Sequence, residues 1–309
     1  MRQSTCASNS EMWPRVAKCL ASLLLAFSAI AAQASTQCQG EGLDTSRVVV
    51  AGGSITEVLY DLGLESRIVA VDRTSNYPAA ARDFPSIGYV RALSAEGVLS
   101  VGPTLIIGED DTGPPEVVKQ LVAADIDIRI VPEQHDADGI IAKVRCVAEL
   151  FDVTETADAF VRETLQPRVE TLAAIQATRS MRGAVLLGIR DGSIIAAGAD
   201  TSGHGLLSMM GADNALQSLN GWKPVSMEAM IAARPDFVVI PERGLRDAGG
   251  EDKLLEHPAL RFSAVAKHRR ILTMDGMAML GFGPRTLVAA ERLALRLSES
   301  QASETDMAP

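Results

Sequence analysis

Short apolar runs alternate with amphipathic segments along most of the chain. Valine and isoleucine dominate the runs, glycine, proline or polar residues bound them, and helical spacing connects them. Runs of this length predict buried strands, and the segments between them predict helices. Strands that alternate with helices are typical of parallel sheets, so we expect an α/β fold. The predicted strands lie at 47–50, 68–71, 105–107, 126–131, 184–188, 238–241 and 270–274, and 194–197 is a candidate hairpin strand.

The alternation stops in one stretch, which we take as a connecting helix over 137–178. Ile140, Val144 and Val147 lie at helical spacing there, and one candidate break follows Asp152. Such a length exceeds that of an ordinary crossover helix. We therefore expect the helix to join two lobes. The predicted N-terminal lobe covers 35–136 and the predicted C-terminal lobe covers 179–298.

The two ends of the chain differ from the lobes. Arg15 and Lys18 precede an apolar run at 20–32, which is followed by a small-x-small site. This pattern predicts a signal peptide over 1–34, and a retained membrane anchor is the alternative. The polar tail at 299–309 is expected to be disordered.

One helix–strand unit occurs twice. Ser94 and Ser226 are each positioned to cap a helix, with Glu96 and Glu228 in the first turn. In both copies a proline follows the glutamate by seven residues and opens an apolar strand. The repeat indicates two similar lobes, although acid-capped helices before strands are common.

Composition narrows the classes of function. The formal net charge of −10 argues against nucleic acid, whose affinity for proteins comes mainly from basic side chains.

Cys6 and Cys19 lie in the predicted leader, which leaves Cys38 and Cys146. In an oxidising compartment these two residues are compatible with a disulfide, and two free thiols are the alternative.

The sequence contains no catalytic signature. It has no Gly-x-Ser-x-Gly elbow, no P-loop and no His-Glu-x-x-His motif, so we do not expect an enzyme. The four histidines lack metal-ligand spacing, and His204, between two glycines, is the least ordinary of them.

Two tyrosines follow predicted strands in loops, where open α/β folds bind ligands. Tyr77 precedes a proline, and Tyr89 lies two residues before Arg91. Packing is the ordinary role of such a tyrosine, and the functional alternative is a phenolate ligand to ferric iron. Arginines that approach from the other lobe could pair with such a ligand, and the candidates are Arg243, Arg246 and Arg285.

Four segments together resemble one family, the substrate-binding proteins of bacterial haem ABC importers, within the wider cluster that binds siderophores and vitamin B12. These segments are 48–57, 72–78, 87–97 and 280–285, and the resemblance covers about residues 46 to 298. It implies two Rossmann-like lobes joined by a long rigid helix, the class III periplasmic binding protein architecture. It also implies a monomer in the periplasm.

The resemblance assigns roles to individual residues. The axial tyrosine of the family falls on Tyr89, and Tyr77 is the second choice. Arg91 and a C-lobe arginine are expected to assist electrostatically, and Glu96 and Glu228 fall on the acids that dock the inner-membrane permease. Expected contacts with the macrocycle are Met277, Met279, Leu280 and Phe282.

The resemblance implies haem as the transported ligand, with a cobalamin or a ferric siderophore on the same fold as the alternative. Some relatives carry a C-lobe histidine where this chain has Ile189 and Arg190. We therefore do not expect a second axial ligand or a second haem.

Overall fold

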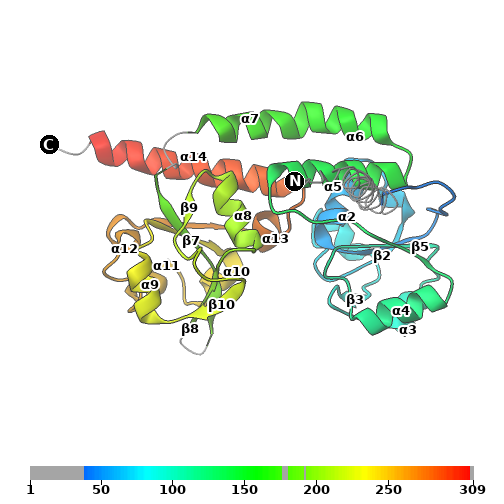
Figure 1. Ribbon diagram of the computed structural model, residues 1–309, viewed down its shortest axis with the longest axis horizontal. Coiled ribbons are helices and arrows are strands. Elements are labelled where there is room, and N and C mark those ends of the chain that lie inside the picture. The colour runs from blue at the N-terminus through cyan, green and yellow to red at the C-terminus, as the bar shows by residue number, and fades with distance from the viewer. Residues whose placement is uncertain (1–37, 176–179, 191–192, 307–309) are drawn as a thin grey trace, which may run out of the picture.

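The computed structural model describes residues 38–175, 180–190 and 193–306. These residues form two α/β lobes side by side, with long helices along one side of both (Figure 1). The α/β fold class is thereby confirmed. The predicted signal peptide at 1–34 lies outside the described residues.

The N-terminal lobe is built on a four-stranded parallel sheet of order β2-β1-β5-β6. Val48 and Val50 pack on one face of this sheet, and Val49 and Ile106 pack on the other. Both faces are therefore buried, which explains why the strands are apolar runs without alternation. The strands are β1 (Val48–Ala51), β2 (Ile68–Val71), β5 (Leu105–Gly108) and β6 (Asp127–Ile130), and the helices are α2 (Gly53–Asp61), α3 (Ala95–Leu99) and α4 (Pro115–Ala123).

A two-stranded hairpin interrupts the alternation between β2 and α3. Its antiparallel strands are β3 (Gly88–Tyr89) and β4 (Ala92–Leu93). Short 3-10 turns at Glu65–Arg67 and Ala79–Asp83 complete the connections of this lobe.

The C-terminal lobe has a mixed sheet of order β10-β8-β7-β11-β12, with β9 also paired to β7. β8 runs antiparallel to β7, which confirms the hairpin partner predicted at 194–197. β10 was not predicted, because its sequence contains Lys223 and Pro224; proline is tolerated there since the strand lies at a sheet edge. The strands are β7 (Arg182–Arg190), β8 (Ser193–Ala197), β9 (Asp213–Asn214), β10 (Trp222–Val225), β11 (Phe237–Pro241) and β12 (Ile271–Met274).

The helices of the C-terminal lobe include two that begin in the polar segment 242–252. These are α10 (Glu242–Asp247) and α11 (Glu251–Glu256). The remaining helices are α8 (Ser202–Met209), α9 (Met227–Ala233), α12 (Ala264–His268), α13 (Gly276–Leu280) and α14 (Pro284–Asp306).

The connection between the lobes is a helical hairpin rather than one helix over 137–178. α5 (Ala137–Leu150) packs on the N-terminal lobe, and the chain then reverses at Asp152, whose φ is 55°. The segment that crosses towards the C-terminal lobe is helical throughout, from α6 (Thr154–Phe160) through a π turn (Val161–Leu165) to α7 (Gln166–Ala174) (Figure 1).

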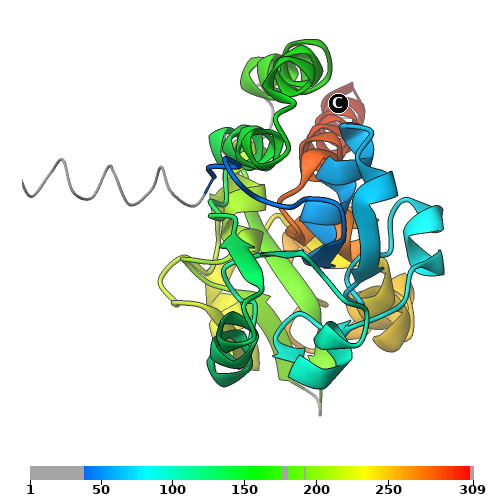
Figure 2. The same cartoon turned by 90° about the vertical axis from the view of Figure 1, so that its right-hand side faces the viewer.

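The green helices α5–α7 and the red helix α14 lie together on one side of the molecule (Figure 2). One apolar cluster extends beneath them through both lobes and includes Val50, Ile140, Val239 and Leu287. The lobes therefore share a core on this side.

α14 continues to Asp306, so the part of the 299–309 tail that the structure describes is helical, not disordered as expected. Glutamate, glutamine and alanine in this tail favour helix despite its polarity. No helix within the described ranges combines the length and apolar character that a membrane crossing requires.

Cys38 and Cys146 form a disulfide, with their Cα atoms 4.8 Å apart. The bond ties the first described residue to α5. Of the two alternatives that the sequence left open, the structure has the disulfide.

Candidate functional site

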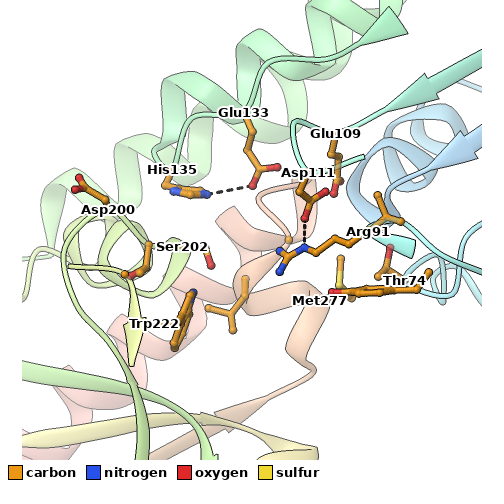
Figure 3. A pocket seen from close by; sticks show the side chains of 16 residues that line it. Thr74, Arg91, Glu109, Asp111, Glu133, His135, Asp200, Ser202, Trp222 and Met277 are labelled. Atoms are coloured by element: carbon orange, nitrogen blue, oxygen red, sulfur yellow. Dashed lines mark hydrogen bonds and ion pairs between the residues drawn. The ribbon is translucent and has the colours of Figure 1, made fainter. Parts of the chain in front are cut away.

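A cavity of about 320 Å³ lies between the two lobes, within the size range of small-molecule sites. The N-terminal lobe contributes mainly charged and polar groups, and the C-terminal lobe adds apolar side chains. The lining residues are Thr74, Tyr89, Val90, Arg91, Glu109, Asp111, Glu133 and His135 from the first lobe, and Asp200, Thr201, Ser202, Gly221, Trp222, Met277, Leu280 and Gly281 from the second (Figure 3).

The hairpin fixes the position of Tyr89. Tyr89 ends β3, and Val90 and Arg91 form the turn to β4. Asp72, buried directly after β2, accepts hydrogen bonds from the backbone N–H groups of Val90 at 3.2 Å and Thr74 at 3.1 Å. A buried carboxylate with several donors is a strong anchor, so the hairpin is held against the end of the sheet.

Two arginines lie near Tyr89. The guanidinium carbon of Arg73 lies 5.8 Å from the centroid of its ring. Arg91 Nε lies 2.6 Å from Asp111 Oδ2, and this hydrogen bond raises the pKa of Arg91 (Figure 3). The Arg91–Asp111 pair is largely solvent-exposed, so either side chain is free to exchange its partner for a ligand at little cost.

A buried polar network connects the cavity to α5. Lys143 is almost fully buried, and its Nζ donates to Ser54 Oγ at 2.7 Å. Ser54 in turn donates to Glu109 Oε1. Burial raises the pKa of Glu109 to about 7, although the charge of Lys143 opposes the shift. Glu109 therefore titrates near neutral pH beside the cavity.

The same lysine reaches a second carboxylate. Lys143 Nζ lies 3.6 Å from Glu133 Oε2. Figure 3 shows the other partner of this carboxylate, His135, whose Nε2 lies 3.2 Å from Glu133 Oε1. Burial opposes ionisation of Glu133, but the bond with His135 and the charge of Lys143 hold its pKa below the usual value. The ring of His135 packs edge-on against Phe282, with centroids 4.8 Å apart.

The structure places Tyr77 outside the described cavity lining. Its ring lies 3.8 Å from the guanidinium carbon of Arg285, a cation–π contact between the lobes. Arg285 also donates from Nη2 and Nε to Glu57 Oε1, at 2.6 and 2.8 Å. Burial raises the pKa of Glu57, and Arg285 counteracts that rise. Tyr77 and Arg285 therefore belong to a contact that joins the lobes.

Four other predicted contacts also lie away from the cavity lining. Arg243 and Arg246 are on α10, and Arg243 faces solvent with its Nε 3.7 Å from Asp247 Oδ2. Met279 is fully buried in the core, whereas Met277 and Leu280 of the same helix line the cavity. Residues three apart share a helix face, which accounts for this difference. Phe282 is likewise buried in the core.

Sequence reasoning missed several lining residues. His135 was taken as an ordinary histidine, and the carboxylates Glu109, Asp111 and Glu133 were not considered. All four follow β5 or β6, at the carboxyl edge of the sheet, and this position was the available signal. Trp222 had no such signal. His204 is half-buried near Asn214 and is not among the lining residues.

Glu96 and Glu228 are both solvent-exposed in the first turn of a short helix. Ser94 and Ser226 accept hydrogen bonds from the backbone N–H groups three residues later, each at 3.2 Å. The repeat found in the sequence is thus present in both lobes. The two helices, α3 and α9, lie on the lower side of the molecule in Figure 1, away from the long helices.

Two lobes of this kind, with a cleft between them and a helical connection along one side, define a substrate-binding protein. The family model described as "Periplasmic binding protein" matches residues 48–276 of the 309, and the chain belongs to this family.

Solved structures and curated relatives agree with this assignment. The periplasmic haem-binding protein BhuT, solved with two haems, is 34% identical with a TM-score of 0.78, covering 82% of this chain and 98% of its own. The haem-binding protein HutB of Vibrio cholerae is 31% identical with a TM-score of 0.75, and the match covers 82% of this chain and 99% of HutB. The vitamin B12-binding protein of Photorhabdus laumondii is 26% identical over 260 residues, covering 82% and 88%.

Proposed function

We propose that this protein captures haem in the cleft between its lobes and delivers it to an inner-membrane ABC importer, with Tyr89 as the ligand to the ferric iron. The observation that carries the proposal is the placement of Tyr89: among the residues that line the cavity it is the one tyrosine, and a hydrogen-bonded hairpin presents it. Four solved haem-binding proteins with 31–34% identity support haem.

Each side of the cavity has a role in this proposal. The phenolate of Tyr89 coordinates iron, a known axial arrangement for haem. Trp222, Met277 and Leu280 supply apolar surface for the macrocycle from the opposite lobe. Arg91 exchanges part of its contact with Asp111 for a haem propionate.

The carboxylates of the cavity constrain how haem sits. Glu109, Asp111 and Glu133 line its N-terminal side, where a propionate would meet like charge. We therefore expect the propionates to point away from Glu109 and Glu133, towards Arg91 and solvent. Arg243, Arg246, Met279 and Tyr77 are not part of the proposed haem contacts.

Cobalamin is the second candidate ligand, because curated relatives with 23–26% identity bind vitamin B12. A carboxylate-rich cavity also suits a ligand without free carboxylates. A ferric siderophore, bound by the same fold, is the third candidate class of ligand.

We further propose that the protein acts in the periplasm as a monomer after removal of the leader at 1–34. Glu96 and Glu228 would dock arginines of the permease, one acid on each lobe. Binding rather than catalysis is then its role, in keeping with a family of binding proteins.

The proposal is tested by titrating the protein without residues 1–34 with haemin, and separately with cyanocobalamin. Trp222 lines the cavity, and the other tryptophan of the chain, Trp13, lies in the leader. We expect saturable one-to-one quenching of Trp222 fluorescence by haemin, with a ferric charge-transfer band, and no saturation with cyanocobalamin. The reverse pattern would replace haem by cobalamin, and saturation with neither would direct the search to siderophores.

A further inference from the structure

Two glycines of the C-terminal lobe lie where this lobe touches the N-terminal lobe. Gly205, in the middle of α8, lies against His135, and Gly283, between α13 and α14, lies against Ser54 of α2. We call these two places the spacer contacts. Neither glycine has a positive φ, so the backbone conformation does not require glycine at either position. Close packing between the lobes accounts for them instead.

The spacer contacts leave no room for a side chain. A methyl group on Gly205 would overlap the backbone carbonyl oxygen of His135 and lie 2.6 Å from its Cβ. A methyl group on Gly283 would lie 3.0 Å from Ser54 Cβ and 3.1 Å from Glu57 Oε2. Carbon atoms pack best at about 3.5–4.0 Å, so alanine at Gly205 requires the lobes to separate there by roughly 1 Å. Alanine at Gly283 requires a smaller separation.

The groups that face the two glycines are held firmly. His135 directly precedes Asp136, the N-cap of α5, and its ring packs against the buried Phe282. Ser54 is buried, and its Oγ accepts a hydrogen bond from the buried Lys143. The spacer contacts therefore cannot yield by rotation of one side chain, and an added methyl group would move whole elements.

The spacer contacts lie directly behind the cavity. His135 lines the cavity, and Ser202 lines it three residues before Gly205. Gly281 lines it two residues before Gly283. α2, α8 and α13 lie next to the long helices α5 and α14, whereas α4 and α9 lie at the other end of their lobes (Figure 1). Because the shared core holds the lobes together along the long helices, a wedge at the spacer contacts would tilt the open ends apart.

We propose that Gly205 and Gly283 are specificity-determining residues, which fix the width of the cavity so that it admits one flat macrocycle and rejects a ligand with bulky groups on both faces. This inference rests on the proposed function, in which the flat ligand is haem. Most of the apolar lining belongs to the C-terminal lobe, and Tyr89 belongs to the N-terminal lobe. The separation of the lobes is therefore the distance that a bound macrocycle must span.

The first measurement follows the lobes without any ligand, in the protein that lacks residues 1–34. Spin labels are attached to Lys119→Cys in α4 and Glu228→Cys in α9, both exposed positions at the open ends of the lobes. Cys38 and Cys146 form a disulfide and do not take up the label. The distance between the two labels then reports the width of the cleft.

Gly97→Ala is the matched control, because Gly97 also lies in a helix and a methyl group there would be 3.7 Å from Ser94, an ordinary contact. We expect Gly205→Ala to lengthen the distance between the labels by roughly 1 Å or more, Gly283→Ala by less and Gly97→Ala not at all. A wild-type distance in a folded Gly205→Ala variant would overturn the proposal. If circular dichroism shows that Gly205→Ala does not fold, an unchanged distance in Gly283→Ala has the same meaning.

The second measurement titrates haemin, and then imidazole as a further iron ligand on the haem-loaded protein. Gly205→Ala should weaken haemin binding by roughly tenfold, because contacts from the opposite lobe fall off across a wider gap. It should also strengthen imidazole binding by roughly threefold or more, because the open face of the haem gains room. General loss of stability would weaken both, so weaker imidazole binding by Gly205→Ala would contradict the proposal.

Failure of the proposed ligand and failure of the spacer contacts give different results. If wild-type protein does not bind haemin, haem is removed as the ligand, and the label distances still test whether the glycines set the width of the cleft. If the label distances are equal in all variants, the spacer contacts are overturned while haemin binding stands.

Discussion

Two of the places where the lobes face each other bring a tyrosine close to an arginine. In the cleft, Tyr89 lies 5.8 Å from Arg73 and two residues from Arg91. In the second contact, which the Arg285–Glu57 pair closes, Tyr77 lies 3.8 Å from Arg285 and is itself 46% exposed. The sequence made both tyrosines candidates, yet only the first lines a cavity.

The difference lies in whether the charge of the arginine is already matched inside the protein. Arg285 is committed to the buried carboxylate of Glu57 and to the face of Tyr77. Arg91 is paired with Asp111 in an exposed position. A tyrosine–arginine pair therefore indicates a ligand site only where the ring lines a cavity and the arginine can change its partner.

The largest expected effect concerns the closed contact. Arg285→Met should lower the free energy of unfolding by about 3 kcal/mol, because it leaves the Glu57 carboxylate buried without its partner. Arg91→Met is the matched change in the cleft and should cost less than about 1 kcal/mol, as for an exposed ion pair. Urea denaturation of the two variants measures both values.

Equal losses of stability for the two variants would contradict this division between a structural contact and an open site. Protonation of Glu57 in the Arg285→Met variant is the expected relief, so its deficit should shrink at low pH.

A smaller effect should appear in the pH dependence of stability. Burial raises the pKa of Glu109 to about 7, so the folded state binds its proton more tightly than the unfolded state does. Stability contributed by this proton is present at low pH and is lost as the pH rises to about 7, by about 2 kcal/mol between pH 5 and pH 8.

Glu109→Gln removes this titration and should flatten the stability profile over the same range. Chemical denaturation at several pH values, with Asp111→Asn as the control in the same cavity, measures the difference. A Glu109→Gln profile as steep as that of wild type would show that other groups, such as Asp61 with its pKa of about 6, dominate the change.

The smallest predicted effect concerns ligand affinity. Arg91→Ala should weaken haemin binding by roughly threefold to tenfold, the size expected for the loss of one solvent-exposed hydrogen bond of about 1 kcal/mol. Arg243→Ala, on the exposed surface of α10, should leave affinity unchanged. Isothermal or fluorescence titration compares the two, and a loss with Arg243→Ala instead would return that residue to the site.

Much of the fold could be predicted because its strands are buried on both faces. The apolar composition of runs such as 48–50 and 105–107 is enough to predict them as strands. Their alternation with helices predicts the two lobes. The reversal at Asp152 was harder, because helical spacing on both sides of a turn is the same as that of one long helix. The last eight residues of α14, 299–306, were missed because polar sequence does not distinguish a solvated helix from a disordered tail.

The site could be predicted only where local sequence decides the geometry. Tyr89 was singled out because it lies in a loop after a predicted strand and because the axial tyrosine of the family falls on it; the structure places it at the end of β3, in the lining of the cavity. Met279 was expected in the cleft and lies in the core, since the sequence of a five-residue helix does not say which face is buried. Trp222 reaches the cavity through packing between the lobes, which no local pattern records, whereas His135 follows β6 at the carboxyl edge of the sheet and could have been found there.

The most direct measurement compares Tyr89→Phe with Tyr77→Phe in a haemin titration followed by absorbance. Each change removes one hydroxyl from a ring that keeps its packing, so the two variants are matched. We predict that Tyr89→Phe loses the ferric charge-transfer band and binds haemin much more weakly, while Tyr77→Phe keeps the wild-type spectrum. Wild-type spectra from Tyr89→Phe, or loss of the band in Tyr77→Phe alone, would contradict the assignment of Tyr89 as the iron ligand.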